Sequence, residues 1–151
     1  MPSPAADQLQ LLHALAKHGV EFVVVGGVAA QIHGWEGATA DLDIAVSREE
    51  SNTERLNAAL ASLGAGHPVI GGLGTVFKTS YGRLEIVRRA DGIGDYAAWL
   101  RNSQQLEIAV GLTIVVAAPS DILQSKEAAG REKDRAVLPQ MRQDFRDSGA
   151  L

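Results

Sequence analysis

The stretch Val20-Glu21-Phe22-Val23-Val24-Val25-Gly26-Gly27 is the clearest structural signal in the chain. Its β-branched run is too apolar for an exposed strand, so it predicts a buried strand that stops at the glycine pair. A short helix is expected next, over residues 28–33. The first N–H groups of a helix have no partner within it, so a glycine turn at this place is suited to bind an anion. The alternative is that the two glycines end the strand for steric reasons only.

A pair of aspartates follows in Asp41-Leu42-Asp43-Ile44, and thirteen residues separate it from Gly27. With the next two residues this segment predicts a strand over 41–46. Alternate strand residues share a face, so Asp41 and Asp43 are expected to project together while Leu42 and Ile44 face the core. Two adjacent carboxylates repel unless a cation or a proton lies between them, and Mg²⁺ prefers such oxygen ligands. The alternative is two solvated acids at the start of a strand.

The other segments alternate between helical and strand patterns. Helices are expected over residues 4–19, with Ser3 as the N-cap, and over 47–63, with Ser47 and Glu50 forming a capping box. Three more helices are expected over 95–101, over 120–129 and from 131 onward, and Pro139 is expected to kink the last one or to start a new segment. Hairpins are expected from the strands 76–79 with 83–87 and 106–109 with 112–117, and residues 64–74 predict a loop. The pattern predicts one α/β domain spanning residues 1–151, with a mixed sheet and helices packed around it.

Composition restricts the possible functions. The chain has 151 residues, 46% of them hydrophobic, and a net charge of −4, which argues against a dedicated nucleic-acid-binding module. The absence of cysteine excludes disulfides, thiolate metal sites and cysteine nucleophiles. The four histidines are scattered and show no metal-ligand spacing. No signal-peptide pattern and no apolar run of the ~20 residues that span a bilayer is present, so a cytoplasmic location without membrane contact is expected.

The glycine pair and the aspartate pair together carry a family resemblance. Val25-Gly26-Gly27 followed by Asp41-Leu42-Asp43-Ile44 resembles the signature of the DNA polymerase β-like nucleotidyltransferase superfamily. Within it the chain looks most like the small bacterial minimal nucleotidyltransferases and AbiEii-type toxins. The resemblance extends over about residues 20–138 and implies the nucleotidyltransferase fold, one or two Mg²⁺ ions and an NTP substrate. The paired glycine amides would then cradle the phosphates.

The resemblance also implies a third carboxylate on a later strand. The matching residue is Glu85, whose neighbours Leu84 and Ile86 are expected to face the opposite side. In the family this residue joins Asp41 and Asp43 as a metal ligand and helps to deprotonate the acceptor hydroxyl. The alternative is a solvent-facing strand residue.

A second match lies near the C-terminus, where Lys126 is followed by Arg131-Glu132-Lys133-Asp134. This is similar to a lysine and "R-x-K-D" stretch in these proteins, where the basic residues lie close to the nucleotide phosphates. The resemblance makes Lys126 the foremost phosphate contact, with Arg131 and Lys133 behind it. The alternative is ordinary helix-surface charge. Asp134 is expected either to orient Lys126 or Arg131, or to cap the last helix.

Two departures from the family pattern matter. Many relatives carry Gly-Ser where this chain has Gly26-Gly27, which removes one hydroxyl but leaves the backbone donors. Relatives often carry an arginine near the position of Gly37, and its absence bears on how substrate or a partner is held. Trp35 and Trp99 are candidates for stacking on a base or for core packing.

The sequence thus predicts a Mg²⁺-dependent nucleotidyltransferase that moves an NMP from an NTP to an RNA, protein or small-molecule acceptor. A toxin-like role with a cognate antitoxin is one form of this hypothesis. The alternative is a non-catalytic domain that keeps the fold and binds a nucleotide or a partner. The three carboxylates favour catalysis, and the missing arginine keeps the alternative open.

Overall fold

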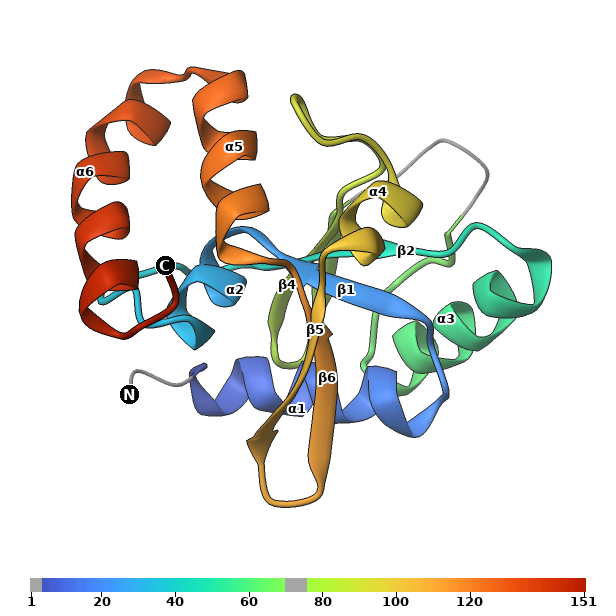
Figure 1. Ribbon diagram of the computed structural model, residues 1–151. Coiled ribbons are helices and arrows are strands. Elements are labelled where there is room, and N and C mark those ends of the chain that lie inside the picture. Colours follow the sequence, from blue (N-terminus) through green and yellow to red (C-terminus); the bar gives the residue numbers. More distant parts are fainter. Residues whose placement is uncertain (1–3, 70–75) are drawn as a thin grey trace.

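The computed structural model describes residues 4–69 and 76–151. The proposed cap Ser3 and part of the expected loop, residues 70–74, lie outside these residues. The described elements, in chain order, are α1 (Ala6–Lys17), β1 (Phe22–Val25), α2 (Gly26–Ile32), β2 (Leu42–Val46), α3 (Glu50–Ser62), β3 (Val76–Thr79), β4 (Gly82–Ile86), α4 (Tyr96–Arg101), β5 (Gln104–Ala109), β6 (Leu112–Val116), α5 (Pro119–Ala129) and α6 (Glu132–Asp147) (Figure 1). Within the described residues, every helix is too short or too polar to cross a lipid bilayer.

The strands form one mixed sheet in the order β3-β4-β2-β1-β6-β5. Strand β1 runs antiparallel to β2 and parallel to β6, whereas β2 runs parallel to β4. The two expected hairpins, β3–β4 and β5–β6, form the edges of the sheet. The predicted α/β class with a mixed sheet and surrounding helices is therefore confirmed.

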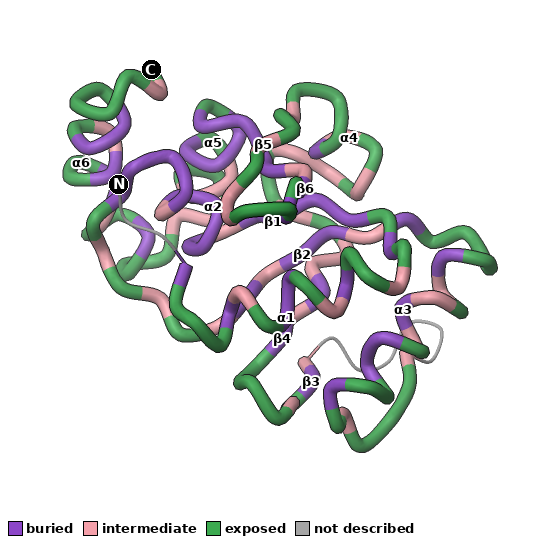
Figure 2. The backbone as a smooth tube through the Cα atoms, turned by 90° about the horizontal axis from the view of Figure 1, so that it is seen from below, coloured by how far each residue is buried: buried purple, intermediate pink, exposed green. Residues whose placement is uncertain are grey.

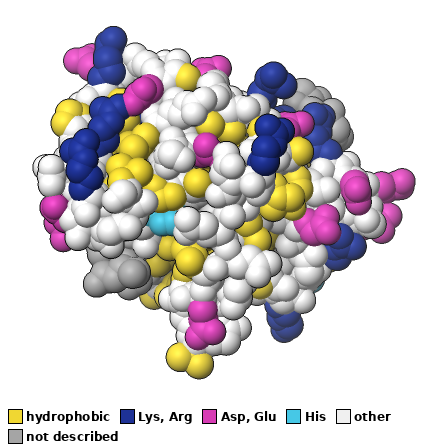
Figure 3. All heavy atoms as spheres, viewed as in Figure 1, with side chains coloured by type: hydrophobic (Ala, Val, Ile, Leu, Met, Phe, Trp, Pro, Cys, Tyr) yellow, Lys and Arg dark blue, Asp and Glu magenta, His cyan; other side chains and the backbone are white. Residues whose placement is uncertain are grey.

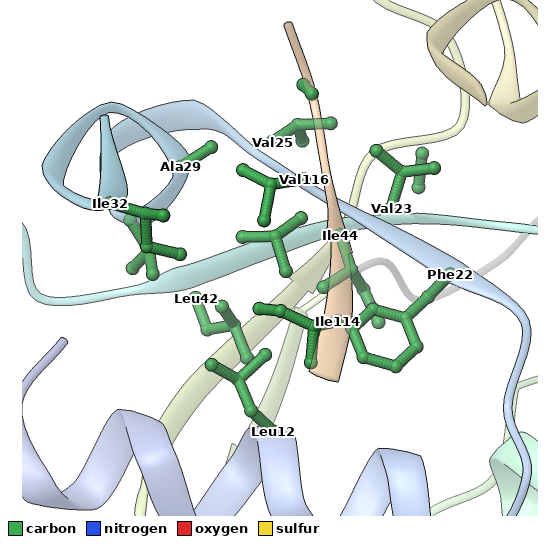
Figure 4. Close-up of a cluster of buried hydrophobic side chains, with 14 of the residues drawn as sticks. Leu12, Phe22, Val23, Val25, Ala29, Ile32, Leu42, Ile44, Ile114 and Val116 are labelled. Carbon is green, nitrogen blue, oxygen red and sulfur yellow. The ribbon is translucent and has the colours of Figure 1, made fainter. Parts of the chain in front are cut away.

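Strand β1 lies at the centre of the core, and all of its residues are buried. Figure 2 shows this strand and most of β2 as buried, whereas the edge strand β5 is exposed or half-buried along its length. In Figure 4, Leu42 and Ile44 of β2 lie in one cluster with Leu12 of α1 and Ile114 of β6. Because successive side chains of a pleated strand point to opposite faces, Leu42 and Ile44 enter this cluster while Asp43 lies on the other face of the sheet.

Helices α5 and α6 form a hairpin on the side of the sheet opposite α1 (Figure 1). Gly130 joins them in the left-handed conformation, with φ of 62°, which glycine adopts without steric cost. Asp144 of α6 accepts a hydrogen bond from the backbone N–H of Glu36 at 3.0 Å. Ser148 donates to the carbonyl of His33 at 2.6 Å. These bonds hold the end of α6 against the segment that links α2 to β2.

Pro139 does not start a new segment, because α6 runs without a break from Glu132 to Asp147. Proline removes one backbone hydrogen bond from a helix, that of the carbonyl four residues earlier, here Arg135. Both Pro139 and Arg135 are exposed, so water can satisfy that carbonyl. The amphipathic packing of the other face keeps the helix continuous.

The expected capping box at Ser47 is also absent. Helix α3 starts at Glu50 with Glu49 as its N-cap, and Ser47 is buried behind it. The side chain of Asn52 donates to the Ser47 carbonyl at 2.8 Å and to the Glu21 carbonyl at 3.1 Å, and it accepts from the Glu21 N–H at 2.7 Å. Ser47 therefore lies directly after β2, and the hydrogen bonds of Asn52 connect α3 to the ends of both central strands.

Asn52→Ala should lower the free energy of unfolding by roughly 2–4 kcal/mol. The side chain is fully buried, and its removal takes one hydrogen bond from each of three backbone groups, of which, within the described residues, only the Glu21 carbonyl keeps another, from the Ser47 N–H. The measurement is urea denaturation followed by circular dichroism. Ser51→Ala, an exposed neighbour on the same helix, is the matched control and should change stability by less than about 0.5 kcal/mol. Equal effects of the two substitutions would contradict this role of Asn52.

Candidate active site

The parallel pairing of β2 and β4 places Asp43 opposite Glu85. The preceding residues of the two strands, Leu42 and Leu84, are completely buried, so the two carboxylates share the other face of the sheet. Adjacent strands lie about 4.8 Å apart, and the two side chains therefore meet. The face that the sequence predicts for Glu85 is the one that it occupies.

Asp43 is held in an environment that disfavours its charge. Burial, together with the neighbouring carboxylates of Glu85 and Asp41, raises the pKa of Asp43 from 3.8 to about 7, with Lys126 acting in the opposite direction. Its Oδ1 is buried and has no hydrogen-bond partner among the described residues. A buried polar atom without a partner costs about 1–3 kcal/mol. The Asp43 carboxylate therefore lowers the stability of the folded protein.

Asp41 differs from Asp43 in its surroundings. It lies directly before β2, which starts at Leu42, and is not held by the strand pairing. Its Oδ2 is 3.9 Å from Arg83 Nε in a partly exposed ion pair, a weak interaction at this distance. Over residues 4–69 and 76–151, no three His, Cys, Asp or Glu side chains lie close enough together to form a ready metal site. Asp43 and Glu85 thus form the assembled pair, and Asp41 stands beside it.

The glycine pair packs directly against the site. Gly26, at the junction of β1 and α2, has φ of +68°, and a Cβ there would lie 2.5 Å from Asp43 Oδ2. A Cβ on Gly27 would lie 2.7 Å from the side chain of Thr39. Glycine is required at both positions, because any larger residue would displace the carboxylate or Thr39. The start of α2 is in this way brought against Asp43.

The basic side of the site comes from the junction of α5 and α6. Lys126 lies in the last turn of α5, Arg131 is the N-cap of α6, and Lys133 is exposed in its first turn. The carboxylate of Asp134 accepts hydrogen bonds from Arg131 and lies 3.7 Å from Lys126 Nζ. In Figure 3, Lys and Arg side chains gather on this face along the edge formed by α6.

A cavity of about 800 Å³ connects these groups. Its lining includes all the site residues predicted from the sequence: Gly26, Gly27, Asp41, Asp43, Glu85, Lys126, Arg131 and Lys133. Segments that are up to about a hundred residues apart in the sequence therefore converge on one hollow. The chemistry of the lining is divided, with carboxylates on the sheet and cations on the helical hairpin.

Arg89 and Asp91 also line this cavity, although the sequence analysis does not select them. They follow β4 in the chain, and Arg89 continues the alternation of Glu85 and Val87, which both line the cavity as well. That period of two is the signal that could have identified Arg89. Asp91 follows the strand in an irregular loop, where no such period applies.

The missing arginine at position 37 has a steric explanation. A Cβ on Gly37 would overlap the indole ring of Trp35, so no side chain fits there. The side-chain amide of Gln31 also donates to the Gly37 carbonyl at 2.9 Å. Trp35 and Trp99 are both buried, with 7% and 2% of their surface exposed, and both contribute to the cavity wall. Their burial favours packing over stacking on a base.

Asp43 should make the protein less stable as the pH rises. In the unfolded chain its carboxyl ionises near the ordinary value of 3.8, but in the folded protein the raised pKa keeps it protonated to about 7. Its contribution to stability is therefore full below pH 4 and is lost as the pH rises to about 7. In protein freed of divalent cations, Asp43→Asn should raise the free energy of unfolding at pH 8 by roughly 2–4 kcal/mol.

Urea denaturation of both proteins at pH 4 and pH 8, in the presence of a chelator, measures this effect. Asp91→Asn, an exposed acid of the same cavity, is the control and should show no such gain. A stability difference between Asp43→Asn and the unmodified protein that is the same at both pH values would contradict the prediction.

Comparison with known proteins supports the fold. No protein-family model and no curated protein sequence matches the chain. Among solved structures, the solution structure of the antibiotic-resistance factor ANT(2″)-Ia aligns with a TM-score of 0.61 and 14% identity, over 94% of this chain and 86% of that chain. The crystal structure of ANT(2″)-Ia in complex with adenylyl-2″-tobramycin aligns with a TM-score of 0.58 and 16% identity, over 95% and 91% of the two chains.

A third solved structure is an antigenic nucleotidyltransferase-like protein from Paracoccidioides brasiliensis. It aligns with a TM-score of 0.54 and 18% identity, over 89% of this chain and 74% of that chain. At these identities the likeness concerns the fold, and the chain has the fold of these nucleotidyltransferase structures. The resemblance to AbiEii-type toxins finds no counterpart among the three.

Proposed function

We propose that this chain is a nucleotidyltransferase that moves an NMP from an NTP to a hydroxyl group of an acceptor. The observation that carries the proposal is the position of Asp43 opposite Glu85, inside the cavity that also contains Gly26 and Lys126. The fold shared with the nucleotidyltransferase structures supports it. Transfer of this kind depends on positioning and on stabilisation of charge, and both kinds of group line the cavity.

The carboxylates fit a divalent cation. Asp43 has a buried oxygen without a hydrogen-bond partner among the described residues, and the neighbouring carboxylates disfavour its charge, a situation that a cation reverses. Asp43 and Glu85 would hold Mg²⁺, and Asp41 would join them by leaving its weak pairing with Arg83. When bound, Mg²⁺ supplies positive charge that neutralises the triphosphate and the leaving pyrophosphate.

The remaining roles belong to the side chains and the backbone. The acceptor oxygen forms a bond to the α-phosphorus while the bond from that phosphorus to pyrophosphate breaks, and the hydroxyl proton passes to the Glu85 carboxylate. The backbone amides of Gly26 and Gly27 donate to the phosphates. Lys126, with Arg131 and Lys133, offsets the negative charge that develops on the pyrophosphate.

A small molecule is the acceptor class that we favour among RNA, protein and small molecules. ANT(2″)-Ia, which aligns over most of the chain, has been crystallised with adenylyl-2″-tobramycin, in which a nucleotide is joined to a small molecule. The net charge of −4 provides no overall attraction for RNA. A toxin-like role with an antitoxin would instead require an RNA or protein acceptor.

The test is transfer of label from each of four α-³²P-labelled NTPs to the small-molecule, RNA and protein fractions of a cell lysate. Transfer that needs Mg²⁺, stops with a chelator and is abolished by Asp43→Ala supports the proposal. Label appearing first in the small-molecule fraction supports the favoured acceptor class. Labelled RNA or protein would point to the toxin-like form.

The second candidate is a non-catalytic domain that binds a nucleotide or a partner. The observation in its favour is that Asp41 is paired with Arg83 and the three carboxylates are not assembled as a ready metal site among the described residues. Tight NTP binding without transfer to any lysate fraction would favour this candidate and would overturn the enzyme.

A further inference from the structure

Asp134 is an acid in the part of the cavity where the cations gather. It lies in the first turn of α6, lines the cavity, and is only 1% exposed. A buried acid beside a phosphate site is unfavourable by itself, because it repels phosphate and loses hydration. Its presence therefore requires a compensating role.

The carboxylate of Asp134 contacts two cations from different places in the chain, Arg131 and Lys126. Arg131 donates through Nε at 2.6 Å and through Nη2 at 3.2 Å to the two carboxylate oxygens. Lys126 of α5 lies with Nζ 3.7 Å from Oδ1. The two-point contact fixes the plane of the guanidinium, whereas the looser contact leaves the lysine donors free for another acceptor.

The carboxylate is held in its charged form. Burial acts to raise the pKa of Asp134, but the hydrogen bonds and charge of Arg131, together with the charge of Lys126, hold that pKa below its usual value. Only Gly130, the left-handed C-cap of α5, and Arg131, the N-cap of α6, lie between the two helices. One charged group thus connects the last turn of α5 to the first turn of α6.

We propose that Asp134 is a positioning residue, which holds Lys126 and Arg131 at the place where the triphosphate binds. The inference rests on the proposed function, since it assigns the phosphates to this end of the cavity. The proposal also gives the two cations different roles. Lys126 bonds the phosphates directly, and Arg131 has Nε and Nη2 occupied by Asp134 and offers its remaining donors.

The proposal makes a prediction opposite to that of simple charge. If Asp134 acted only through its charge, Asp134→Asn would remove a repulsion and tighten the binding of a polyphosphate. If it positions the cations, the same substitution releases Arg131 and Lys126 and weakens binding.

Isothermal titration with ATP and with inorganic tripolyphosphate, each with MgCl₂, distinguishes these outcomes. We expect Asp134→Asn to weaken both ligands about tenfold or more, and Asp134→Glu to restore part of the affinity. Asp144→Asn is the matched control, because Asp144 is a buried acid of the same helix that accepts from Glu36 and Gln140 and does not line the cavity. It should lower the melting temperature and leave both affinities within about twofold.

Unchanged or tighter binding by Asp134→Asn would overturn the positioning role, while Mg²⁺-dependent transfer by the unmodified protein would keep the proposed function. If Asp134→Asn does not fold, Asp134→Glu decides, because weaker binding at an unchanged melting temperature is expected only of a positioning residue. An unmodified protein that binds neither ligand overturns the positioning role, and the separate transfer assay then decides the proposed function.

Discussion

Replacing Asp43 by asparagine should reduce the rate of nucleotide transfer about a thousand-fold or more. Asp43 is the carboxylate that the structure buries, pairs with Glu85 and leaves with an unpartnered oxygen. The amide keeps the size of the side chain and removes its charge, so the cavity retains its shape but loses the group that would hold the cation. The measurement is the initial rate of label transfer from NTP at saturating Mg²⁺.

The loss of activity should not be accompanied by unfolding. The same variant is expected to be more stable than the unmodified protein at pH 8 without divalent cations, because it no longer buries a charge. Asp144→Asn, which changes a buried acid that does not line the cavity, should lose stability and keep most of its activity. If Asp43→Asn retained more than about a tenth of the activity, Asp43 could not be the central carboxylate.

Gly26→Ala is expected to have the second largest effect, a loss of activity of about a hundred-fold. At φ of +68° an alanine is strained, and its Cβ would lie 2.5 Å from Asp43 Oδ2 and 3.3 Å from Asp43 Cβ. The carboxylate must leave its position opposite Glu85 to accommodate it. The backbone strain itself should cost about 1–2 kcal/mol of stability. Transfer rate and urea denaturation are measured on the same preparation.

Gly111→Ala separates strain from displacement of the carboxylate. Gly111 lies in the turn of the β5–β6 hairpin at φ of +74°, and a Cβ there meets nothing within 4 Å. It should show a similar loss of stability with unchanged activity. Equal losses of activity in the two variants would mean that strain, and not contact with Asp43, explains the Gly26 effect.

Several elements were predictable because their signals are local. The apolar run that forms β1, the glycine pair that ends it and the alternation in β2 each depend on neighbours in the chain. Both hairpins carry a glycine near the turn and strand patterns on either side. Turn chemistry and side-chain alternation act within a few residues, so they can be recognised from the sequence.

Other features depend on packing and were missed. Pro139 predicts a kink or a new segment from its own chemistry, but α6 continues past it, with the carbonyl of the exposed Arg135 open to water. Ser47 has the local pattern of a helix cap, but Asn52 of the following helix binds its carbonyl and keeps it at the end of β2. A tertiary contact outweighs the cap preference of Ser47, which is worth about 1 kcal/mol, and the packing of α6 offsets the cost of a proline inside a helix, about 3 kcal/mol.

By itself, the sequence determined which strand is buried, where it ends, and that Asp43 faces away from the core. These properties follow from the order of apolar, polar and glycine residues along a short stretch. Only the tertiary structure decided that Glu85 lies opposite Asp43, that Asp41 stands apart with Arg83, and that Asp134 is buried between two cations. Register between strands and burial of a charge depend on many contacts among distant segments, and no local pattern encodes their sum.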